Sequence, residues 1–114
     1  MTRPDRPAGC LSIQGGTACS GENAAVAGFL ASSRLAGELA LADRFTRAVA
    51  EGDLPADADP AALARFVMSV TEGQAIHAAA GVAREDLRQT AEIALAGFAA
   101  VSGARPPASA DNPA

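Results

Sequence analysis

The sequence predicts an all-α protein, built as an antiparallel bundle of helices. Roughly a quarter of the residues are alanine, the strongest helix former, and much of the apolar content is therefore small side chains. Apolar residues recur at spacings of three and four in three long stretches, as on one face of a helix. No alternation of apolar and polar residues is long enough to indicate a β-strand.

The organisation expected along the chain is one helical domain over residues 9–102, between a flexible N-terminus at residues 1–8 and a disordered tail at residues 103–114. The first part of the domain, "CLSIQGGTAC", is ambiguous. Leu11, Ile13 and Gln14 favour a helix there, and Gly15 and Gly16 weaken it.

A long helix is expected from about Asn23 to Glu51, where Gly52 stops it. It is apolar over about half its circumference. Arg34 and Glu38 fall inside this apolar arc, four residues apart, so they can pair along the helix. The pair is either an ordinary surface pair of small energetic value or a polar spot in a ligand cavity.

The second long helix is expected over residues 60–80. Asp59 suits the N-cap, and Pro60 suits the first helical position, where its missing N–H costs nothing. Gly81 suits the left-handed position that ends a helix. A third helix is expected over residues 84–101, before the breaker sequence "SGARPP".

Composition excludes several kinds of partner. The net charge is −4, all nine basic residues are arginine, and they form no stripe that could follow a phosphate backbone. We therefore expect no direct DNA binding by this chain alone. Its uninterrupted apolar runs are far shorter than the roughly 18 residues of a membrane span. No membrane association is expected, and the cytoplasm is the expected location.

The chain shows no pattern typical of an enzyme. "GGTACSG" lacks the glycine spacing and the lysine of a phosphate-binding loop. Cys10 and Cys19 match no zinc or redox spacing, and Glu72 and His77 are not spaced as a helical metal pair. His77, the single histidine, has no visible nucleophile or acid beside it. We predict no catalytic residue, no metal and no cofactor.

The apolar faces predict an oligomer. On the helix over residues 60–80, one stripe changes from apolar to polar at Gln74 and His77. The last helix has two apolar faces, one with Leu87 and Phe98, the other with Ile93 and Gly97. Three helices can cover one such face but have little left for the second, so we expect the second to pack against a partner chain.

Together, "GCLSIQGGTAC", the long helix, the turn "EGDLPADADPAALARF" and the helix end "GQAIHAAAG" resemble the C-terminal half of bacterial TetR/AcrR-family transcriptional regulators over residues 9–101. The resemblance implies a C-terminal effector-binding domain whose last two helices form a four-helix dimer interface with a second subunit. The family's helix-turn-helix DNA-binding domain has no counterpart in this sequence. The chain would be a truncated gene, a frame with a misplaced start codon, or a stand-alone module.

The resemblance also places the expected sites. A hydrophobic or aromatic effector would contact residues of "CLSIQGGTAC" and the long helix, namely Leu11, Gln14, Thr17, Phe29, Leu30 and Arg34. The homodimer interface would comprise Leu63, Phe66, Val67, Val70, Gln74, His77, Leu87, Ala91, Ile93, Ala94, Gly97 and Phe98. His77 would meet its mate across the two-fold axis or, alternatively, contact a ligand. Two other functions stay open: a module that pairs with a full-length regulator, and a small protein that binds hydrophobic ligands.

Overall fold

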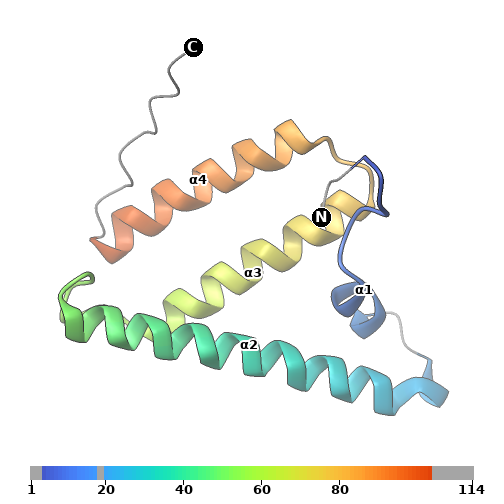
Figure 1. Cartoon of the computed structure of the whole chain (residues 1–114), viewed down its shortest axis with the longest axis horizontal. Coiled ribbons are helices and arrows are strands. Elements are labelled where there is room, and N and C mark those ends of the chain that lie inside the picture. The colour runs from blue at the N-terminus through green and yellow to red at the C-terminus, as the bar shows by residue number, and fades with distance from the viewer. Residues whose placement is uncertain (1–3, 18–19, 104–114) are drawn as a thin grey trace.

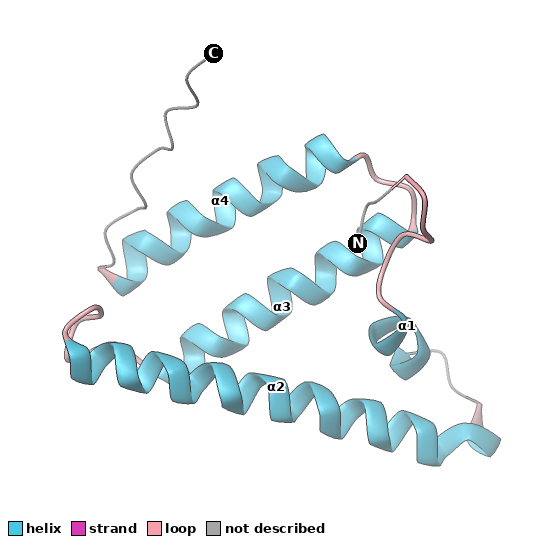
Figure 2. Cartoon of the chain, viewed as in Figure 1, coloured by secondary structure: helices cyan, strands magenta, loops and turns pink. Residues whose placement is uncertain are grey.

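The computed structural model describes residues 4–17 and 20–103. Within these ranges the regular structure is helical, with no strand (Figures 1 and 2). The elements are α1 (Leu11–Thr17), the short 3-10 helix η1 (Gly21–Asn23), α2 (Ala24–Glu51), α3 (Pro60–Ala79) and α4 (Arg84–Ser102). The all-α prediction is confirmed, and α2, α3 and α4 end within one residue of their expected bounds.

The three long helices form a shallow array. They run in alternating directions along the chain, and α1 lies beside the N-terminal half of α2 (Figure 1). The molecule measures 47 × 38 × 18 Å along its principal axes. Since one helix with its side chains is about 10 Å across, so thin an array leaves large parts of each helix uncovered.

The ends of the helices have the expected causes. Gly52 and Gly81 adopt φ angles of 83° and 91°, in the left-handed region where a side chain is strained. The carboxylate of Asp59 accepts a hydrogen bond of 3.0 Å from the backbone N–H of Ala62. Pro60 occupies the first turn of α3. The turn between α2 and α3 is therefore encoded locally.

Replacing Asp59 with alanine should lower the free energy of unfolding by about 1 kcal/mol, because N–H groups in the first turn of α3 lose their side-chain acceptor. Chemical denaturation measures this change. Asp57→Ala, in the same turn and outside the helix, is the matched control and should be close to neutral. Equal losses in both variants would show that Asp59 does not act as a cap.

The ambiguous segment "CLSIQGGTAC" contains a helix, α1, in spite of its glycines. Gly15 lies against α2, where a Cβ atom would come within 3.2 Å of Leu30 Cδ1. The missing side chain thus permits close packing of α1 on α2. Ile13 of α1 is buried. Tertiary contact therefore outweighs the weak helix propensity of this stretch.

The core is small. Its central cluster is formed by Ala48, Leu54 and Leu63, at the end of the molecule where α2, the following turn and α3 meet. Phe45 and Phe98 pack against this cluster, with ring centroids 5.6 Å apart. Phe98 thus ties α4 to α2. Three of the six other buried residues described, Ala64, Ala75 and Ala78, are alanines, which bury little apolar area each.

Several large apolar side chains lie outside this core. On α2 they include Phe29, Leu35 and Leu39. Residues 21–51 are also long and apolar enough, by these two criteria alone, to cross a membrane. The lengths of the uninterrupted apolar runs did not predict this, because polar residues interrupt the apolar sequence of the helix. Helices that pack inside water-soluble proteins can meet the same criteria.

The expected flexible ends are only partly described. Residues 4–8 form exposed turns and bends before α1. Gly103 adopts a φ of 63° and ends α4. Residues 1–3 and 104–114, expected to be flexible and disordered, lie outside the described residues, as do Ala18 and Cys19.

Candidate functional site

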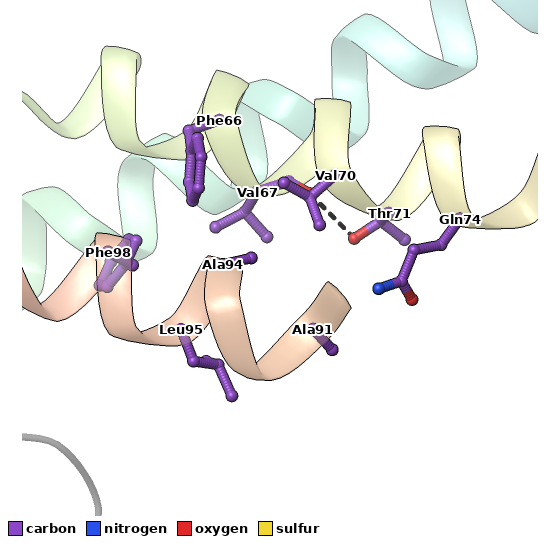
Figure 3. A pocket seen from close by; sticks show the side chains of 9 residues that line it. All are labelled: Phe66, Val67, Val70, Thr71, Gln74, Ala91, Ala94, Leu95 and Phe98. Carbon is purple, nitrogen blue, oxygen red and sulfur yellow. Dashed lines mark hydrogen bonds between the residues drawn. The ribbon is translucent and has the colours of Figure 1, made fainter. Parts of the chain in front are cut away.

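The helix pair α3–α4 carries all twelve residues expected at a dimer interface. An apolar cleft of about 230 Å³ lies between the two helices (Figure 3). Its walls are Phe66, Val67, Val70, Thr71 and Gln74 from α3 and Ala91, Ala94, Leu95 and Phe98 from α4. The space between the helices is not filled, because α4 places small alanine side chains opposite the valines of α3.

The structure divides the twelve expected interface residues into two groups. The first group lies inside the chain, with Leu63 in the central cluster and the others between α3 and α4: Val67, Val70, Gln74, Leu87, Ala91, Ala94 and Phe98. These side chains pack the pair together, so their apolar pattern does not itself require a second chain. The second group is exposed or lies at the edge of the pair: Phe66, His77, Ile93 and Gly97.

Gln74 has a partner within its own chain. Its side-chain Nε2 donates a hydrogen bond of 3.1 Å to the backbone carbonyl of Leu87, on α4. The bond is partly buried and joins the two helices. A polar residue on an otherwise apolar stripe is thus explained without a second subunit. A contact between Gln74 and its mate across a two-fold axis stays a prediction.

One side of the α3–α4 pair carries exposed apolar side chains. We define this outer face by the residues that share it at helical spacing: Gly73, Ile76, His77, Thr90, Ile93, Gly97 and Val101. Ile93 and Val101 are 74% and 77% exposed. A Cβ atom at Gly73 or Gly97 would meet nothing within 4 Å, so both glycines border open space. The outer face leaves room for another helix to approach closely.

His77 lies in a second, more polar cleft of about 310 Å³ on this side of the pair. Ser69, Asp86 and Thr90 line the same cleft. His77 is exposed, so it is reachable by a partner chain or by a ligand, and both expected roles stay predictions. Among the described residues no group of three or more histidine, cysteine or acidic side chains could hold a metal ion.

The six expected effector residues lie on α1 and α2, and a common pocket among them stays a prediction. Leu11 and Phe29 are 84% and 72% exposed. Leu30 packs on Gly15 of α1. Gln14 is exposed, and the side chain of Thr17 lies outside the described residues.

Arg34 is placed differently from the other five. It lines a cavity between α2 and α3, together with Glu38 and Glu72. The expected pairing of Arg34 with Glu38 along α2 is wrong. Instead Arg34 Nε lies 4.0 Å from Glu72 Oε1 on α3, and Glu38 Oε1 lies 3.1 Å from Arg65 Nη2 on α3. Both charges point from α2 toward α3, where partners of opposite charge are available.

The comparisons with known proteins point to transcription. The chain is 32% identical over 95 residues to the HTH-type transcriptional repressor ComR of Escherichia coli (strain K12). These residues are 83% of this chain but only 45% of that repressor, so the chain spans less than half the length of its relative. No protein-family model matches the chain, and no solved structure matches it. The chain is thus distantly related to a transcriptional repressor.

Sequence reasoning missed some residues of these surfaces. Ile76 and Val101 belong to the exposed outer face, and Met68 belongs to the cavity between α2 and α3. Helical spacing from Gly73 and Gly97 could have found the first two. Met68 could not be assigned, since its position depends on how α2 crosses α3.

Proposed function

We propose that this chain is the effector-binding and dimerisation portion of a TetR-like transcriptional regulator. The single observation that carries the proposal is the outer face of the α3–α4 pair, which leaves large apolar side chains uncovered beside two glycines. The similarity to ComR supports a role in regulation. Without a partner, such a face would be unfavourable in water.

The dimer forms when the outer face packs on its own copy, giving a four-helix arrangement. A two-fold axis brings the same surface of both chains together. Ile93 and Val101 then fill space above the partner's glycines, where backbones approach closely. Each large apolar side chain that becomes fully buried in the dimer stabilises it by roughly 1.5–3 kcal/mol.

The chain's charges fit a role that does not include holding DNA directly. Arg44, Arg65 and Arg88 each lie within 4.0 Å of a carboxylate on the same chain. Arg88 also lowers the pKa of Glu85, by donating hydrogen bonds to its carboxylate. Such arginines are partly neutralised and contribute little attraction for a phosphate backbone. Operator binding then belongs to other parts of the regulator, which acts in the cytoplasm.

Sedimentation equilibrium of the purified chain tests the proposal. We expect the chain to be a dimer at micromolar concentration. A folded monomer at these concentrations, with the circular dichroism of a helical protein, would contradict dimerisation through the outer face.

A further inference from the structure

The cavity between α2 and α3 has both charged and apolar walls. It measures about 260 Å³ and is lined by Ala31, Arg34, Leu35 and Glu38 from α2 and by Met68, Ser69 and Glu72 from α3. We infer that this cavity binds a small organic cation with a short apolar portion. The inference rests on the proposed function, in which such a cation would be the effector.

The balance of charge in the walls favours a cation. Two carboxylates, Glu38 and Glu72, face the cavity with one guanidinium, Arg34. The carboxylate side chains are only 22% and 32% exposed. Water therefore screens their attraction for a ligand less than it would at the surface. The net charge of −4 on the whole chain acts in the same direction.

The carboxylate of Glu72 retains capacity to accept hydrogen bonds. Its contact with Arg34 Nε is 4.0 Å long, which is beyond hydrogen-bonding distance. Arg34 is shared, because its Nη1 also donates to the backbone carbonyl of Ser12 in α1, at 3.5 Å. An amidinium or ammonium group in the cavity would supply the short, charge-assisted hydrogen bonds that Arg34 does not.

Glu38 leaves one oxygen for the same ligand. Both contacts from Arg65, through Nε and Nη2, are made to Oε1, each at 3.1 Å. The Arg65 side chain is 68% exposed, so it holds Glu38 from the solvent side. Glu38 lies on α2 and Glu72 lies on α3. A cation bound between the two carboxylates would therefore draw the two helices together.

The other walls set the size and polarity of the ligand. Ala31, Leu35 and Met68 supply apolar surface, and the flexible thioether of Met68 adapts to different shapes. A volume of about 260 Å³ accommodates one aromatic ring with a small charged group. An anion would be repelled by two partly buried carboxylates, and a neutral ligand would not form charge-assisted hydrogen bonds with them.

The direct test uses three probes of one shape: the cation benzamidine, neutral benzamide and anionic benzoate. The chain has two methionines, Met1 and Met68, so carbon-13 labelling of methionine methyl groups gives two signals, which Met68→Leu assigns. We expect benzamidine to shift the Met68 signal saturably, with a dissociation constant at or below about 1 mM. Benzamide and benzoate should not shift the Met68 signal.

A charge variant locates the site. Glu72→Gln keeps the shape and removes the charge, and it should weaken benzamidine binding about tenfold or more. The matched control, Glu85→Gln, changes an exposed carboxylate on α4 and should bind as the original chain does. If Glu72→Gln loses its helical circular dichroism, the comparison of the three probes on the original chain decides.

Three results would overturn the inference: no shift of the Met68 signal at about 10 mM benzamidine, equal shifts with benzamide or benzoate, or unchanged affinity in folded Glu72→Gln. Sedimentation of the same samples separates this inference from dimerisation. A monomer that binds benzamidine would contradict only the dimer, and a dimer that does not bind it would contradict only the cation site.

Discussion

Replacing Ile93 with aspartate is expected to dissociate the dimer and to leave each chain folded. Ile93 is 74% exposed in the single chain, so the aspartate stays in water there. In the dimer its charge would be buried without a partner, and the two-fold axis places it in the interface twice. Such burial costs several kcal/mol, which corresponds to a dissociation constant raised by about 100-fold or more. Sedimentation equilibrium measures the shift, and circular dichroism checks the fold.

Leu39→Asp is the matched control for that experiment. Leu39 is also apolar and 67% exposed, but it lies on α2, away from the outer face of the α3–α4 pair. The substitution Leu39→Asp should change the dissociation constant of the dimer no more than a fewfold. If Leu39→Asp dissociates the protein and Ile93→Asp does not, the chains pair through α2, and the proposed interface is wrong.

Truncating Phe98 to alanine is expected to be the most destabilising of the substitutions considered, lowering the free energy of unfolding by about 3 kcal/mol. Phe98 packs on the central cluster and on the ring of Phe45, 5.6 Å away between centroids. Its loss removes the aromatic contact that ties α4 to α2 and leaves a cavity. Chemical denaturation measures the change, at one fixed protein concentration because dimerisation also contributes.

Leu95→Ala serves as the control for Phe98→Ala. Leu95 precedes Phe98 by one turn of α4 but is 59% exposed, so its truncation should cost about 1 kcal/mol or less. The comparison distinguishes a contact of the core from the general loss of an apolar side chain on α4. Equal effects of the two substitutions would show that Phe98 is not part of the core of the isolated chain.

The similarity to a transcriptional repressor and the structure support different parts of the proposal. The similarity, which covers 83% of the chain, connects the chain to regulation. The structure provides two sites, the outer face of the α3–α4 pair and the cavity between α2 and α3. In the proposal, the outer face assembles the dimer and the cavity binds the effector.

The sequence alone determined the helices and their ends. Helix propensity, glycine at left-handed positions and the cap at Asp59 act over a few residues, so local rules predicted α2, α3 and α4 within one residue at each C-terminal end. The helical period also predicted that α4 has more apolar surface than three helices can cover. It could not show which of its faces pointed inward, because both are apolar.

The tertiary structure decided the contacts between helices. It assigned Val70 and Phe98 to packing within the chain and left Ile93 exposed, since the rotation of each helix about its axis is fixed only when all helices pack together. It formed α1 in spite of two glycines, because Gly15 fits against Leu30. It also turned Arg34 and Glu38 from each other toward partners on α3. Charge pairs and cavities between helices depend on distances between residues far apart in sequence, and such distances exist only in the folded chain.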